Sequence, residues 1–188
     1  METKPTSGQR GSATGAAVAP KASLEQVLAH CGDAHEFCAA LAKLFGLRLT
    51  EVALLRVDKG LLKFLFPEEL KTAGAIPVSS SSAIAAHTAS TKKVELFNTF
   101  AKVKHARVFE TVRLAGKEDT ERSEQLQIQK LMSAPVMGSD RKVAGVIQVC
   151  RKGFDLGSAG PDFTPRDLQQ LELASAVAAK MPFMKENG

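Results

Sequence analysis

Histidines and cysteines are the residues of this sequence with the most obvious capacity for chemistry. Cys31, His35 and Cys38 fall at i, i+4 and i+7, which places three potential metal ligands on one face of a helix. Gly32 and Asp33 interrupt that helix, however, and Cys38 belongs to an apolar stripe. We therefore expect structural cysteines beside an exposed histidine, and no metal site.

His87 is the second candidate, because it shares one face of a predicted helix with Ile84 and Thr88. Its imidazole could hydrogen-bond a ligand, coordinate haem iron or satisfy a neighbouring carbonyl group. A packed and satisfied histidine is the commonest of these outcomes. The same alternatives apply to His105. Neither histidine is surrounded by Asp, Ser or Cys in the pattern of a catalytic triad.

Four serines, residues 79–82, precede the helix that carries His87. The exposed N–H groups at such a helix start could hold a carboxylate or a phosphate. Serine is also the residue expected at a helix N-cap. We favour the capping interpretation.

Residues 128–153 predict a hairpin of two buried strands around a polar turn at residues 138–142. Both faces of the second strand are largely apolar, which is typical of a strand in the middle of a sheet. Its two faces carry Val143, Gly145, Ile147 and Val149 on one side and Ala144, Val146, Gln148 and Cys150 on the other. Pro135 cannot donate to a ladder, so we expect it at a bulge or on an unpaired side.

Capping residues and turns predict the remaining elements. Residues 23–26 have the Ser-x-x-Gln spacing of a capping box, and Asp33 can cap a second helix. A hairpin is predicted over residues 52–66, with its turn at residues 58–60. Thr164 can cap a terminal helix. Pro165, the next residue, suits the first position of that helix.

The order of these elements resembles the GAF domain, a small-molecule sensing module of bacterial signalling proteins. The segments IPV, SSSSAIAAHTASTKK and VELFN are similar to the part of GAF domains where a strand leads into a short helix and a further strand ends in Asn. The resemblance extends from Asp33 to Met181. It implies an α+β fold, a GAF-like α/β/α sandwich with a central antiparallel sheet of five or six strands. The terminal helices are expected on one face and the helix with His87 on the other.

The resemblance also implies a pocket between the sheet and the helix that carries His87. The expected ligand-binding residues are Ile84, His87, Phe97, Asn98, Phe109 and Met132. Four of them offer apolar walls, while His87 and Asn98 offer directional polar groups. Residues 112–130 fit either a lid over this pocket or a solvated loop. The resemblance implies no particular ligand or cofactor.

Departures from better-known GAF classes narrow the expected function. Thr99 follows Asn98, so the Asn-Lys pair of cyclic-nucleotide-binding members is absent. No cysteine lies between Cys38 and Cys150, which argues against covalent bilin attachment and against the thiol chemistry of free-methionine-sulfoxide reductases. We therefore expect a non-catalytic sensor that signals to a partner protein in trans. The alternatives are a redox or haem-linked GAF enzyme or sensor, and a ligand-free interaction scaffold.

Composition agrees with one folded domain at residues 23–182, between tails at residues 1–22 and 183–188. Hydrophobic residues make up 44% of the 188 residues, and no apolar run is long enough for a membrane span. No secretory signal is evident, so a cytoplasmic location is expected. The net charge of +5 is scattered along the chain, which argues against a nucleic-acid interface.

The last predicted helix has more apolar surface than one sheet contact requires. Its stripe contains Leu168, Leu171, Ala174, Ala178 and Met181, and Leu173 and Val177 extend it. We expect this excess to meet the helix at residues 33–45 of a second subunit. The sequence therefore predicts a homodimer.

Overall fold

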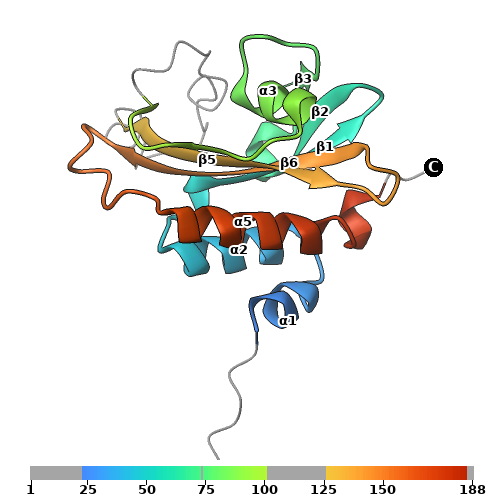
Figure 1. Ribbon diagram of the computed structural model, residues 1–188, viewed down its shortest axis with the longest axis horizontal. Coiled ribbons are helices and arrows are strands. Elements are labelled where there is room, and N and C mark those ends of the chain that lie inside the picture. The colour runs from blue at the N-terminus through green and yellow to red at the C-terminus, as the bar shows by residue number, and fades with distance from the viewer. Residues whose placement is uncertain (1–22, 73, 101–125, 186–188) are drawn as a thin grey trace, which may run out of the picture.

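A six-stranded antiparallel sheet lies between two helical layers (Figure 1). The computed structural model describes residues 23–72, 74–100 and 126–185. The strands are β1 (Val52–Asp58), β2 (Leu61–Phe66), β3 (Ala75–Pro77), β4 (Glu95–Phe97), β5 (Gln127–Met137) and β6 (Val143–Gly153). Their order in the sheet is β3-β2-β1-β6-β5-β4. The predicted sandwich and both predicted hairpins are confirmed.

The helices divide between the two faces of the sheet as predicted (Figure 1). One face carries α2 (Ala34–Phe45) and α5 (Pro165–Ala178), with α1 (Leu24–Ala29) packed beyond them, and the other carries α3 (Ile84–Thr91). Short 3₁₀ turns are η1 (Leu49–Glu51), η2 (Glu68–Leu70) and η4 (Pro182–Met184). No helix within the described ranges has the length and apolar character needed to cross a bilayer.

The helix starts follow from the capping residues that the sequence contains. The side chain of Ser23 accepts a hydrogen bond from the backbone N–H of Gln26, and the Gln26 side chain completes the capping box. Asp33 accepts from the backbone N–H of Glu36 at 2.8 Å. Thr164 starts α5 in a second capping box. Each cap satisfies a backbone donor that has no partner inside its helix.

The β5–β6 hairpin is buried on both faces. Side chains that alternate along it belong to different cores, because successive residues of a strand point to opposite faces. The side chains that face α2 and α5 are those of Met132, Ala134, Val136, Ile147 and Val149. The side chains that face α3 include those of Leu131, Val146 and Cys150. Pro135 lies opposite Val146 in β6, and beyond the residues of β5 that pair with β4. The expected unpaired side for this proline is therefore observed.

The apolar stripe of α5 faces its own sheet. Leu171, Ala174, Ala178 and Met181 are buried, and the stripe of α2 is buried in the same core. Val177 was expected to add outward apolar surface, but only 9% of it is exposed, whereas Leu173 is 37% exposed. The surface assigned to a second subunit is thus mostly covered within the chain, and the homodimer stays a prediction.

The domain extends beyond the predicted end at residue 182. Met184 in η4 is buried in the core between the sheet and the helices. The guanidinium group of Arg56 in β1 donates to the carbonyl oxygens of Phe183 and Lys185, at 3.3 and 3.0 Å. The predicted boundary is therefore too early, because η4 covers apolar surface that α5 leaves open.

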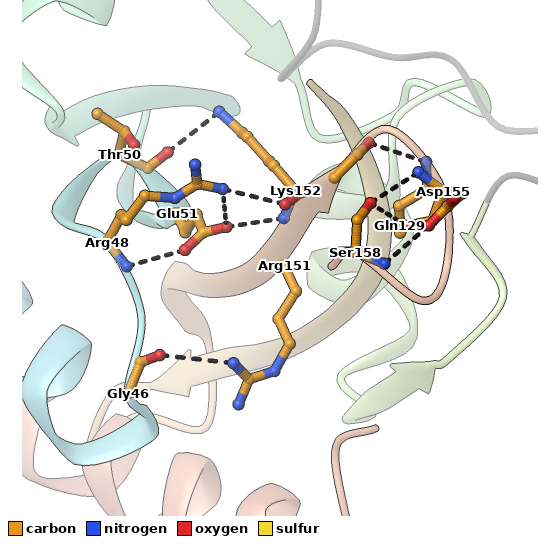
Figure 2. A network of polar contacts seen from close by, with 10 residues as sticks. Gly46, Arg48, Thr50, Glu51, Gln129, Arg151, Lys152, Asp155 and Ser158 are labelled. Carbon is orange, nitrogen blue, oxygen red and sulfur yellow. Dashed lines mark hydrogen bonds and ion pairs between the residues drawn. The ribbon is translucent and has the colours of Figure 1, made fainter. Parts of the chain in front are cut away.

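A network of charged groups fastens η1 to the end of β6 (Figure 2). The buried carboxylate of Glu51 accepts hydrogen bonds from Arg48 Nη2 and from the backbone N–H groups of Arg48 and Lys152, at 2.7 to 2.8 Å. Burial alone would raise the pKa of Glu51, but these hydrogen bonds outweigh burial and hold the pKa below its ordinary value.

Arg151 extends this fastening to the C-terminal end of α2 (Figure 2). Its guanidinium group donates to the carbonyl oxygen of Phe45 at 3.0 Å and lies 4.8 Å above the ring of Phe163. A cation at a helix C-terminus is favourable for the helix dipole. These charged residues are committed to holding elements together, so we do not assign them to a ligand site.

Substituting Gly145 by alanine should destabilise the fold. A Cβ atom at this position would lie 2.1 Å from the backbone oxygen of Leu55 and 2.5 Å from Met184 Cε. We expect the free energy of unfolding, measured by urea titration, to fall by roughly 1–3 kcal/mol or more, as for overpacked cores. Gly157→Ala is the control, because its nearest contact would be 3.5 Å away. Equal stability of the two variants would contradict this packing.

Glu51→Gln should lower the free energy of unfolding at pH 7 by roughly 1.5–3 kcal/mol, the range for hydrogen bonds to charged groups. The folded-state pKa of Glu51 lies below its ordinary value of 4.5. Its stabilising contribution is therefore present above about pH 4.5 and is lost as the pH falls through the folded-state pKa. Urea titrations at several pH values should show the gap to the wild type narrowing in acid. Glu69→Gln, at an exposed position, should match the wild type throughout.

Candidate functional site

Helix α3 lies close to the sheet because its inward face is made of alanines. Ala85, Ala86 and Ala89 are buried against β1, β2 and β6. The sequence predicts a serine cap for this helix, and that prediction is wrong. Its N-cap is Ala83, which is 2% exposed and makes no side-chain capping bond, while Ser80 and Ser82 hydrogen-bond to each other. Burial of Ala83 against the sheet positions this helix start.

A chain of polar side chains runs from α3 through β4 to the middle of the sheet. His87 Nδ1 lies 2.8 Å from Glu95 Oε1, and Thr88 Oγ1 lies 2.6 Å from Glu95 Oε2. Thr88 Oγ1 is also 2.7 Å from Ser133 Oγ, which accepts from Gln148 Nε2 at 3.2 Å. Thr88 and Ser133 are fully buried, and Gln148 is 5% exposed. We call these five residues the polar chain.

The direction of the hydrogen bonds in the polar chain follows from its donors and acceptors. A carboxylate only accepts, and a hydroxyl group has one hydrogen. Thr88 therefore donates to Glu95 and accepts from Ser133, which in turn accepts from Gln148. Because the Glu95 carboxylate only accepts, Nδ1 of His87 is the donor in their hydrogen bond. All donors thus point toward Glu95, which satisfies groups that would otherwise be costly to bury.

The polar chain reaches the surface at His87, beside an apolar cluster. The His87 side chain is 46% exposed and that of Glu95 is 14% exposed. Ile84 is buried in a cluster to which Phe97 is packed, and Phe97 lies edge to face with Phe100. The cluster also contains Ile128, Leu131 and Cys150. We call the half-exposed His87, together with Glu95, Phe97 and the buried Ile84 beneath them, the His87 site.

The other predicted ligand-binding residues lie elsewhere. Met132 is fully buried on the opposite face of the sheet, in the core with α2 and α5, so it cannot line a pocket with Ile84. Asn98 donates to the carbonyl oxygen of Phe163 and accepts from its N–H, both at 2.9 Å, which fastens the end of β4 to the start of α5. Phe109, His105 and most of the proposed lid at residues 112–130 lie outside the described residues.

The cysteines are placed as expected for structural residues. Cys38 is buried in the core, and burial raises its pKa. Burial also raises the pKa of Cys31, with the nearby carboxylates of Glu36 and Asp33 adding to the effect. His35 packs against the edge of Phe66 instead. Within the described parts of the chain, no group of three His, Cys, Asp or Glu residues is positioned to bind a metal ion.

The His87 site offers one directional polar group beside apolar side chains. A half-exposed imidazole held by a carboxylate can orient one polar group of a ligand, and the neighbouring apolar side chains can cover its carbon atoms. Thiols with raised pKa values are poor nucleophiles, and Cys150 is 1% exposed. The Ser133 hydroxyl is buried and committed to the polar chain.

Sequence reasoning missed Glu95, Ser133 and Gln148. The sequence did contain a signal for Ser133 and Gln148, because each is a polar residue within an apolar stretch, at residues 131–137 and 143–150. In the structure the two residues lie directly opposite each other in the ladder. A polar residue at a buried strand position needs a partner. Glu95 had no comparable signal, since its pairing depends on the path of the chain between α3 and β4.

No family model and no curated protein matches this sequence. Solved structures do match the fold. The GAF domain of an Acinetobacter phosphoenolpyruvate-protein phosphotransferase aligns with a TM-score of 0.57 and 14% identity, covering 82% of this chain and 85% of that one. Part of a methyl-accepting chemotaxis protein aligns with a TM-score of 0.54 and 16% identity, covering 84% and 93%.

An enzyme is also among the similar structures. A type II free methionine-R-sulfoxide reductase from Thermoplasma acidophilum aligns with a TM-score of 0.53 and 12% identity, over 80% of this chain and 88% of that one. At these identities the similarity establishes the fold alone. The chain has a GAF-like fold, in agreement with the resemblance of its sequence elements.

Thr88→Val tests whether the polar chain holds α3 and β4 on the sheet. The substitution keeps the side-chain shape but leaves Glu95 and Ser133 without their shared partner. We expect the free energy of unfolding to fall by roughly 1–3 kcal/mol, the cost of unsatisfied buried groups. Thr91→Val, in the same helix but exposed, should change it by less than about 0.5 kcal/mol. Urea titration of both variants checks this, and equal losses would refute the assignment.

Proposed function

We propose that this chain is a non-catalytic sensory domain that binds a small molecule at the His87 site and signals to a partner protein in trans. The observation that carries the proposal is the polar chain, which connects the half-exposed His87 to the middle of the sheet. Burying the polar groups of Thr88, Ser133 and Gln148 is costly unless each is satisfied. Their arrangement supports a role in linking a surface site to the sheet.

Ligand binding would act through Glu95, on which the donors of the polar chain converge. A ligand that hydrogen-bonds His87 changes how strongly this imidazole is held by Glu95, and Thr88 shares the same carboxylate. Next in the polar chain are Ser133 in β5 and Gln148 in β6. The opposite face of these two strands packs against α5. A ligand with different affinities for two arrangements of this chain would shift their populations.

Sensing is favoured over enzymatic activity by the character of the side chains at the site. The described cysteines are buried or have raised pKa values, and the buried hydroxyl groups of the polar chain already have partners. A sensor needs only differential affinity, which a polar group and apolar walls can provide. We further propose that the protein acts in the cytoplasm, where free thiols remain reduced.

His87→Ala should weaken binding of the small molecule by about 1–2 kcal/mol, if His87 supplies one buried hydrogen bond to it. Native mass spectrometry of protein purified from its own host identifies the compound, and calorimetry measures its affinity for wild type and variant. His30→Ala, at the exposed C-cap of α1, is the control and should bind as the wild type does.

Three outcomes would count against this proposal. Unchanged affinity in a folded His87→Ala protein would remove His87 from the binding site. Failure of that variant to fold, judged by circular dichroism and urea titration, would assign His87 a structural role instead. An absorption spectrum with haem or flavin bands would identify a different kind of sensor or enzyme.

A further inference from the structure

A groove of about 1040 Å³ lies along the edge of the sheet, on a surface separate from the His87 site. One wall is residues 92–94, which connect α3 to β4, and the other is the C-terminal half of α5. Its apolar lining contains Val94, Pro135 and Met137, with Ala176 from α5 and Ala179 from the C-cap of that helix. This volume is at the upper end of the range of roughly 300–1,000 Å³ for small-molecule pockets. The groove therefore has room for several residues of a peptide.

The rim of the groove is strongly basic. Lys92, Lys93, Lys180 and Lys185 line it, whereas Glu172 is the single carboxylate among its lining residues. None of these four ammonium groups lies within 4.0 Å of a carboxylate of the described residues. Lys92 donates to the carbonyl oxygen of Arg141 at 3.0 Å, which holds it at the rim. Their uncompensated positive charge attracts anionic groups.

We propose that this groove binds an acidic, extended peptide segment of a partner protein. An apolar lining inside a charged rim matches the organisation of protein interfaces, where apolar side chains fill the centre and charged groups surround them. Carboxylates of the segment would meet the lysines, and its apolar side chains would cover Pro135 and Met137. The inference supplies the output surface of the proposed sensor, and to that extent it rests on the proposed function.

A peptide fits this lining better than nucleic acid does. Single-stranded nucleic acid binds through a basic groove combined with aromatic side chains on which bases stack, and the residues lining this groove include no aromatic. Phosphate recognition commonly uses the bidentate fork of arginine, and the lining contains lysine alone as its basic residue.

A short segment of the chain, residues 92–94, connects the groove to the His87 site. Residues 92–94 follow the helix that carries His87 and Thr88, and they precede Glu95. Lys92 ends α3 in the left-handed conformation, with a φ of 57°. Any change in the distance between α3 and Glu95 must therefore move this short wall of the groove. Peptide binding and binding at the His87 site should influence each other through it.

The experiment selects peptides on the full-length protein from a random-sequence library of Asp, Glu, Leu, Val and Ser. Fluorescence polarisation then measures a selected peptide and its counterpart with Asn and Gln in place of Asp and Glu. The groove variant is Lys93→Glu with Lys180→Glu. The control is Lys43→Glu with Arg166→Glu, which changes the net charge equally at exposed positions outside the groove. Urea titration verifies that every variant is folded.

We expect the acidic peptide to bind, its amide counterpart to bind weakly, and the groove variant to lose about tenfold or more in affinity, because opposed charges have been made alike. The control variant should bind like the wild type. The inference is overturned if no acidic peptide is enriched, if both charge-reversal variants lose equal affinity, or if an oligonucleotide or polyphosphate displaces the peptide and proves the tighter groove ligand.

Peptide binding by the His87→Ala protein separates the two proposals. If this variant retains the peptide but has lost the small molecule, both proposals stand. If a folded His87→Ala protein retains its small-molecule affinity while the groove variant loses the peptide, the groove stands and the His87 site falls. Loss of the peptide by every variant, the control included, contradicts the groove alone.

Discussion

The burial of the β5–β6 hairpin on both of its faces is the constraint on which the other elements depend. Apolar side chains project from both sides of these central strands, so each face needs its own cover. α2 and α5 cover one face, and the large side chains there come mainly from α2, whereas three of the five buried residues of α3 on the other face are alanines. Gly145 shows how closely the layers approach, because even a methyl group there would overlap β1 and η4.

Polar groups inside the α3 layer are the main departure from this apolar scheme. Ser133 and Gln148 sit opposite each other in the central strands, where two apolar residues would have packed without any need for partners. Their hydrogen bonds reach Thr88 and, through it, the carboxylate of Glu95. The cost of burying them is offset only while α3 and β4 keep their positions. The polar chain thereby connects the packing of α3 to the half-exposed His87.

The short connection between α3 and β4 joins two surfaces of different character. On the α3 face of the sheet, this connection lies between the half-exposed His87 in α3 and Glu95 at the start of β4. The two residues have apolar neighbours there. At the edge of the sheet the lysines of this connection form the rim of a basic groove against α5. The proposed binding site and the proposed peptide groove thus lie at the two sides of one segment.

The sequence by itself determined those features that depend on residues close together in the chain. Ser23, Asp33 and Thr164 mark helix starts because their side chains bond to N–H groups three residues away. Apolar residues on both faces of residues 143–150 mark a central strand. Only the tertiary structure decided which face each residue occupies. Met132 and Leu131 are neighbours on opposite faces, and Asn98 bonds to Phe163 across 65 residues. The pairing of His87 with Glu95 likewise depends on packing between α3 and β4, because no local pattern encodes a contact set by how two separate elements pack.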